Sequence, residues 1–325
     1  MNAPRPLLRR IGIRKASPAR LLACRFLRRT GLLLGLALLL PTTPTLAAGL
    51  GAGQPVTIPH ARQYDLASPQ TGQRYRIFVS APSTPPPPAG YPVIYVLDGN
   101  AAFPLAAHIS RNIERRQPVT GIAPALVVGI GYAGNDDYHM AARSHDYTLA
   151  AGRYDPASGG GAEGFLDFIE QDLKPRIAAT FTVNRKKQAI FGHSYGGLFV
   201  LHTLFTRPEA FSTYIAASPS IWWQDKHVLD EMRAFLASRG EQQPWPTVQI
   251  SVGATEDEPP KGRLSPELLA MRAKRPMVAE ARQLTATLQS HPASAGRVSY
   301  HELAGENHGS AWPPALSRGF DLFLE

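Results

Sequence analysis

Residues 188–205 read QAIFGHSYGGLFVLHTLF, and this stretch decides how the chain folds. The apolar run Ala189–Phe191 predicts a short buried strand, and the apolar run that begins at Leu198 predicts a buried helix. Between them lies the pattern Gly-x-Ser-x-Gly, with Ser194 at its centre. A sharp turn from strand to helix needs glycines, because a Cβ atom does not fit where the two backbones cross. We therefore predict that Ser194 is a nucleophile at a helix N-terminus, where a developing oxyanion is stabilised.

Further apolar runs on both sides of this stretch predict strands, and helical patterns lie between several of them. Strands are expected at Gln63–Leu66, Arg74–Ser80, Val93–Leu97, Ala125–Ile130, Tyr214–Ala216, Val248–Val252 and Val298–Leu303. Helices are expected at Phe165–Ile177, Leu229–Leu236, Pro266–Leu288 and Ala315–Leu324. This alternation predicts one α/β domain over residues 53–325, with a mostly parallel sheet that follows an N-terminal hairpin. The stretch Tyr132–Gly164 has no regular pattern, which is typical of a loop that is either functional or disordered.

The charge of the chain is concentrated at its N-terminus. The sequence holds 34 Lys and Arg against 25 Asp and Glu, but nine of the basic residues and none of the acidic ones lie in residues 1–47. The remaining basic and acidic residues balance, which argues against a nucleic-acid-binding protein. Cys24, the only cysteine, also lies in this segment, so neither a disulfide nor a cysteine metal site is expected in the rest of the chain.

Residues 1–47 are typical of an export signal. The apolar run Gly31–Leu40 is ten residues long, too short to span a bilayer, and Thr45–Ala47 offers a small-residue cleavage site. We expect a mature chain that starts near Ala48, is periplasmic or secreted, and has no stable membrane insertion. An uncleaved N-terminal anchor is the alternative.

A serine nucleophile needs a base, and the base needs an acid that fixes its tautomer. His308 lies in a glycine-flanked loop between the last expected strand and the last expected helix, where the base of an α/β-hydrolase belongs. The side chain of His193, within the Gly-x-Ser-x-Gly turn, is expected to point away. Three adjacent acids follow the strand Val248–Val252, and we favour Glu256, with Asp257 next.

The oxyanion is expected to be bound by the backbone N–H of Tyr195 and by one from the loop at Gly99 and Asn100. A second glycine pattern, at Gly129–Gly134, matches the dinucleotide-binding fingerprint G-x-G-x-x-G. Acidic and polar residues without a helical apolar period follow it, so we interpret it as a chance match.

Several motifs together resemble the putative-esterase (esterase D-like) branch of the α/β-hydrolases, and most closely its exported siderophore esterases of the enterobactin/salmochelin type. The matching segments are Tyr95–Asn100, Val128–Tyr132, Arg143–Thr148, Gly159–Gly161, Gly192–Leu198 and Ser218–Trp223. The resemblance implies a three-layer α/β sandwich without a metal or organic cofactor, and it supports Ser194, His308 and Glu256 as the catalytic residues.

Three further residues are candidates for binding the substrate. Arg143 is expected either to bind an anionic substrate or to form a structural pair with Asp146. Trp222 and Trp223 are expected to line an aromatic-accepting pocket or to pack at a loop.

The sequence thus predicts an exported serine hydrolase that acts on a small-molecule carboxylic ester, possible substrates being siderophore-type esters. The alternatives are an acyltransferase on the same scaffold and a non-catalytic protein that binds siderophores or carbohydrates.

Overall fold

The computed structural model describes residues 52–325, apart from 150–159, 241–242, 260–261 and 263. Contacts within the chain separate Met1–Pro55 from Val56–Glu325, and the fold below is that of the second unit. The expected leader, residues 1–47, lies outside the described residues.

The elements alternate along the chain much as the sequence predicts. The strands are β1 (Ala61–Ala67), β2 (Arg74–Ser80), β3 (Tyr91–Val96), β4 (Leu126–Tyr132), β5 (Val183–His193), β6 (Thr213–Ala217), β7 (Thr247–Gly253) and β8 (Val298–Leu303). The α-helices are α1 (Gly99–Thr120), α2 (Met140–Asp146), α3 (Ala162–Asp167), α4 (Lys174–Thr180), α5 (Tyr195–Thr206), α6 (Val228–Ser238), α7 (Pro266–Ala273), α8 (Met277–Gln289) and α9 (Trp312–Leu324). A π-helical stretch joins α3 to α4, and short 3₁₀ turns are η3 (Trp223–Lys226) and η4 (Pro292–Ser294).

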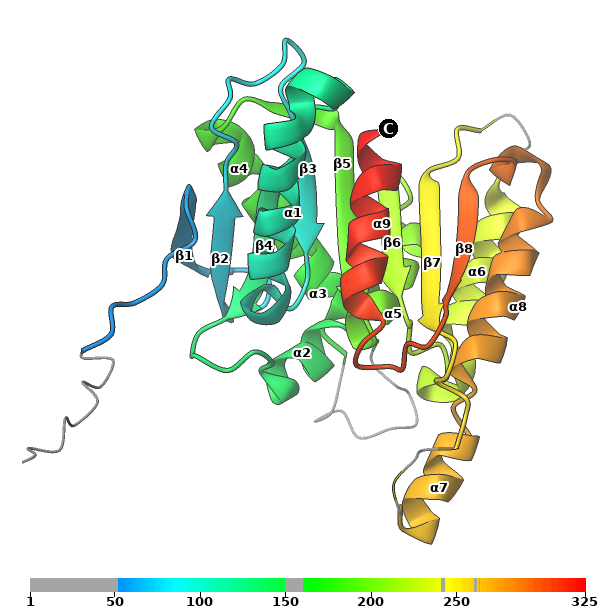
Figure 1. The fold of residues 1–325 in the computed structure, drawn as a ribbon. Coiled ribbons are helices and arrows are strands. Elements are labelled where there is room, and N and C mark those ends of the chain that lie inside the picture. The colour runs from blue at the N-terminus through cyan, green and yellow to red at the C-terminus, as the bar shows by residue number, and fades with distance from the viewer. Residues whose placement is uncertain (1–51, 150–159, 241–242, 260–261, 263) are drawn as a thin grey trace, which may run out of the picture. The chain divides into compact units, whose positions relative to one another are not determined.

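The strands form one sheet in the order β1-β2-β4-β3-β5-β6-β7-β8. The predicted hairpin β1–β2 is antiparallel and joins β4 in antiparallel orientation, whereas the pairs from β4 to β8 are all parallel. The carboxyl ends of β5, β7 and β8 therefore meet at the same edge of the sheet (Figure 1). In open α/β sheets this is the edge at which ligands bind.

Helices cover both faces of this sheet, which explains the unbroken apolar runs of its central strands. Along β3, Val93 and Tyr95 pack into one core with α3, α5, α6 and α8, and Ile94 and Val96 pack into the other core. The second core is closed by α1 and α9, which lie together in front of the sheet in Figure 1. The predicted α/β sandwich with a mostly parallel sheet is confirmed.

Several expected elements differ from the structure. The irregular stretch Tyr132–Gly164 contains α2, and the expected helix Phe165–Ile177 is interrupted by the π-helical stretch Phe168–Leu173. The segment at Gly99 and Asn100 is the first turn of the long helix α1 rather than a loop, and this helix contains Pro104 and Pro118, which are unusual inside a helix. The expected single helix Pro266–Leu288 is two helices, because Pro276 cannot continue the hydrogen bonding of α7 and stands at the N-cap of α8.

The glycine-rich segment at Gly129–Gly134 has a packing role. A Cβ atom on Gly129 would lie 2.8 Å from the side chain of Phe103, and one on Gly131 would lie 2.0 Å from Asn100 Oδ1. These glycines let α1 lie directly against β4, which accounts for the pattern without a nucleotide.

Candidate active site

Ser194 lies at the corner between β5 and α5 in a conformation that few residues other than glycine adopt, with φ 60° and ψ −116°. A Cβ atom on Gly192 would lie 2.2 Å from the carbonyl oxygen of Gly196, and one on Gly197 would lie 2.8 Å from that of Ala217. The glycines of the motif are therefore required where the strand, the helix and β6 approach one another. This turn presents the Ser194 hydroxyl at the carboxyl edge of the sheet.

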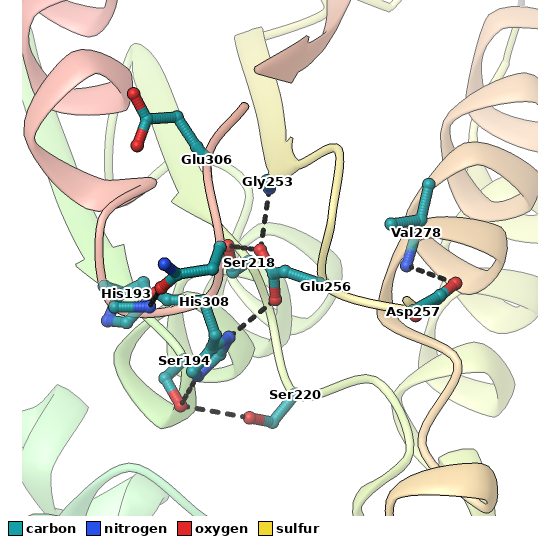
Figure 2. A network of polar contacts seen from close by, with 12 residues as sticks. His193, Ser194, Ser218, Ser220, Gly253, Glu256, Asp257, Val278, Glu306 and His308 are labelled. Atoms are coloured by element: carbon teal, nitrogen blue, oxygen red, sulfur yellow. Dashed lines mark hydrogen bonds and ion pairs between the residues drawn. The ribbon is translucent and has the colours of Figure 1, made fainter. Parts of the chain in front are cut away.

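His308 lies between the serine and a buried carboxylate (Figure 2). Its Nε2 atom is 3.1 Å from Ser194 Oγ, and its Nδ1 atom is 2.6 Å from Glu256 Oε2. The Glu256 side chain is fully buried, whereas 42% of the His308 side chain is exposed. The three residues come from the connections after β5, β7 and β8, so the parallel sheet assembles them from distant parts of the chain.

The structure separates the acids that the sequence could not tell apart. Asp257 points away from His308, and its Oδ2 atom accepts hydrogen bonds from the first-turn amides of Val278 and Ala279 in α8, at 3.1 and 3.2 Å (Figure 2). Glu258 is exposed. Of the three neighbours, Glu256 is the one whose carboxylate contacts His308.

Two groups that the sequence analysis missed hold the Glu256 carboxylate. Its Oε1 atom accepts hydrogen bonds from the Ser218 hydroxyl at 2.5 Å and from the Gly253 amide at 2.7 Å. Ser218 follows β6 with a positive φ of 42°. Its position at the carboxyl end of the strand next to β5 was the available signal, because such ends share one edge of the sheet.

Comparisons with known proteins identify the family. Residues 68–322 match the model of the family described as Putative esterase. The chain belongs to this family. The ferri-bacillibactin esterase of Bacillus subtilis is 39% identical over 285 residues, which cover 84% of this chain and 93% of that protein. The siderophore triacetylfusarinine C esterase of Aspergillus fumigatus is 36% identical, with 83% and 95% covered.

Solved structures show the same fold. The siderophore hydrolase EstA of Aspergillus nidulans superposes with a TM-score of 0.74 at 32% identity, with 85% of this chain and 97% of that chain covered. The predicted α/β-hydrolase fold and the predicted family are confirmed, and the protein is a carboxylic ester hydrolase.

The helix N-termini beside Ser194 supply free backbone donors in this esterase. The N–H groups of Tyr195 and Gly196 lie in the first turn of α5, and those of Gly99 and Asn100 lie in the first turn of α1. N–H groups in a first turn have no acceptor within their own helix. The starts of the two helices are adjacent. A Cβ atom on Gly196, in the first turn of α5, would lie only 3.6 Å from Cβ of Leu97, which stands two residues before α1. The Asn100 side chain itself is occupied, since it bonds the backbone N–H and C=O of Tyr132 at 2.9 and 3.1 Å.

Arg143 lines the pocket beside Ser194, but its partner is not the one expected. Its Nε and one terminal nitrogen form a bidentate pair with the Asp98 carboxylate, at 2.8 and 2.9 Å, and both residues are buried. Burial opposes the charge of Arg143, but the hydrogen bonds and the charge of Asp98 outweigh it and raise the pKa of Arg143. The expected pair with Asp146 is wrong, because that carboxylate instead binds Tyr75, Tyr132 and His145.

The two tryptophans have different positions. Trp222 lines a pocket of about 310 Å³ together with Ser194, Tyr195 and His308. Trp223 is absent from the lining and packs edge-on against Tyr195, with ring centres 5.0 Å apart.

His193 does not point away from the site as expected. Its Nε2 atom is 2.8 Å from the backbone oxygen of His308, and the two rings lie 4.7 Å apart. Burial lowers the pKa of His193 to about 3, and positive charge on His308 and Arg143 acts in the same direction. A neutral His193 thus donates Nε2–H to the His308 carbonyl and fixes the loop that carries His308.

None of the helices that the structure describes combines the length and apolar character needed to cross a bilayer. The described part of the chain also holds no cluster of three or more His, Cys, Asp or Glu side chains suited to a metal ion. The absence of a cofactor from the reaction stays a prediction.

Proposed function

We propose that this esterase uses Ser194, His308 and Glu256 as a catalytic triad for hydrolysis of siderophore esters outside the cytoplasm. The observation that carries the mechanism is the continuous chain of contacts from the Ser194 hydroxyl through the His308 ring to the buried Glu256 carboxylate. The names of the two curated relatives, which are esterases of different siderophores, support the substrate class.

The reaction follows from these contacts. His308 Nε2 takes the proton of Ser194 Oγ as that oxygen attacks the ester carbonyl, and Glu256 stabilises the imidazolium through Nδ1–H. The oxyanion is bound by the N–H groups at the starts of α5 and α1, those of Tyr195 and of Gly99 or Asn100. His308 then protonates the leaving alcohol, and water attacks the acyl-enzyme by the same route and releases the acid.

Hydrolysis of p-nitrophenyl butyrate by the purified protein and its Ser194→Ala variant tests the mechanism. Loss of the nucleophile is expected to lower kcat by a factor on the order of 10⁶, because the three residues act as a unit. Ser290→Ala, an exposed serine at the end of α8, is the matched control and is expected to retain full activity. Equal rates in the parent and in Ser194→Ala would remove this serine from the mechanism.

Two further measurements address substrate and location. Chromatography of a triscatecholate triester and a hydroxamate ester after incubation with the enzyme is expected to show fragments from cleaved ester bonds. An added alcohol that captures the acyl group in preference to water would instead identify an acyltransferase.

Export is supported by the composition of residues 1–47. The N-terminal sequence of the protein from the extracytoplasmic fraction is expected to start near Ala48.

A further inference from the structure

The pocket beside Ser194 is closed on one side by the segment 264–276, here called the arm, which comprises α7 and the turn before α8. Arg272 and Arg275 of the arm line this pocket with Arg143, Glu256 and His308. The arm belongs to the connection between β7 and α8 and extends from the body of the sheet in Figure 1.

The charges within this pocket do not cancel. Arg143 is neutralised by Asp98, and Glu256, which faces His308, contributes one negative charge against the two remaining arginines, Arg272 and Arg275. Arg272 donates to the backbone oxygens of Glu256 and Glu258, at 2.7 and 3.1 Å, and so keeps its positive charge without a carboxylate. Among the residues that the structure describes, no carboxylate lies within ion-pair distance of Arg275 either. The pocket therefore carries an excess of positive charge next to the nucleophile.

In the described part of the chain, stacking rather than hydrogen bonding holds the Arg275 side chain. Its guanidinium carbon lies 3.8 Å from the centre of the Trp222 ring, and the side chain is half-buried. Stacking on an indole fixes the plane of a guanidinium but leaves the N–H groups at its edge free to bind a planar anion. Such an edge binds carboxylates and phenolates through charge-assisted hydrogen bonds.

We propose that Arg275, stacked on Trp222, binds a negatively charged group of the ester and makes the enzyme select anionic esters over neutral esters of the same shape. This inference rests on the proposed ester hydrolysis and adds that the charge of the ester decides which substrates are preferred. Arg272 strengthens the same field, and Trp222 offers an apolar surface for an aromatic part of the substrate.

Two matched pairs of esters test the selection. In the first, p-nitrophenyl p-carboxybenzoate is compared with its carboxamide analogue, which places the charge on the acyl side. In the second, p-acetoxybenzoate is compared with p-acetoxybenzamide, which places it on the alcohol side. The quantity measured is the ratio of kcat/KM for the anionic ester to that for the neutral one.

In at least one pair, Arg275→Gln is expected to lower this ratio by roughly fivefold to tenfold, the effect of one partly screened ion pair. Arg275→Lys, which keeps the charge, is expected to restore part of the ratio, and Arg62→Gln, an exposed arginine on β1, to leave it unchanged. Raising the salt concentration is expected to lower the ratio of the parent toward that of Arg275→Gln. An unchanged ratio in both pairs, or an equal loss for the anionic and neutral esters, would overturn the proposal.

Binding to the Ser194→Ala variant separates this inference from the mechanism. That variant retains the arm, and quenching of its tryptophan fluorescence by the two nitrophenyl esters gives their dissociation constants without turnover. Tighter binding of the anionic ester that is lost in Ser194→Ala/Arg275→Gln supports charge selection even if the parent hydrolyses neither ester. Equal binding of both esters to Ser194→Ala, together with an unchanged kinetic ratio, would refute charge selection even if the parent is an active esterase.

Discussion

Replacing Glu256 by Gln, with Asp257→Asn as the matched control, tests which acid supports His308. The substitution keeps the size of the side chain and an oxygen that can accept from Ser218 and from the Gly253 amide. With that oxygen so placed, the amide NH₂ faces His308 Nδ1, which now must accept a hydrogen bond. The ring is then held in the tautomer with the proton on Nε2, and Nε2 cannot take the proton of Ser194.

The size of the effect follows from the burial of the carboxylate. The Glu256 side chain is fully buried and its contact with Nδ1 is 2.6 Å long, so water cannot replace it at this nitrogen. A wrong histidine tautomer in such a triad costs on the order of 10⁴ in kcat. We therefore expect kcat to fall by a factor of about 10³ to 10⁴. This corresponds to about 4 to 5.5 kcal/mol of activation free energy.

Steady-state hydrolysis of p-nitrophenyl butyrate between pH 6 and pH 9 measures this loss, with circular dichroism spectra to confirm that both variants fold. Asp257→Asn is expected to change kcat less than threefold, because an asparagine oxygen still accepts from the first turn of α8. A parent-like rate in Glu256→Gln, or a larger loss in Asp257→Asn, would refute the assignment of the acid.

Two further predictions concern stability. Although burial lowers the pKa of His202, its ion pair with Glu163 and its hydrogen bond with Glu231 outweigh this effect and raise it to about 9. These two contacts of His202 therefore contribute on the order of 3 kcal/mol to the free energy of unfolding. This contribution is fully present below pH 6.5 and is lost as the pH rises to 9. Urea unfolding at pH 6, 8 and 10 is expected to show this decline in the parent and a flatter profile in His202→Gln; parallel profiles would contradict it. The Cβ of Gly192→Ala would lie 2.2 Å from a backbone oxygen of α5, and thermal unfolding is expected to show that this variant loses about 3 kcal/mol or more of stability. In the control Gly164→Ala, within α3, the nearest atom would lie 3.6 Å from the new Cβ, so this variant is expected to be neutral or slightly stabilised. Equal shifts in the two variants would argue against a tight crossing at Gly192.

The sequence located the parts of the site that depend on local pattern. Ser194 follows from a strand, a glycine-flanked turn and a buried helix within eighteen residues. His308 follows from its place after the last strand. The conformation at Ser194 and the glycines around it leave few other residue types possible in this turn. For His308 the constraint is its position in the loop after the last strand.

What the sequence left open depends on partners far away in the chain. The choice between Glu256 and Asp257 is made by Ser218 and by the start of α8, which draw adjacent side chains in opposite directions. Arg143 pairs with Asp98, 45 residues distant, rather than with the acid three positions on. No local pattern encodes such choices, because they are set by how the strands order themselves in the sheet.

The link from Arg272 to the Glu256 carbonyl has a consequence for how this enzyme can diversify. The arm and the acid share one connection, and this 2.7 Å hydrogen bond joins them, so a change that re-aims the arm also disturbs the group that orients His308. Exchange at Arg275 alone leaves this hydrogen bond in place, whereas replacement of the whole arm, Arg272 included, does not. Lineages that rebuild the whole arm are expected to carry compensating substitutions around the acid, and a chimera that receives only the arm of a relative is expected to inherit its selectivity at the expense of turnover.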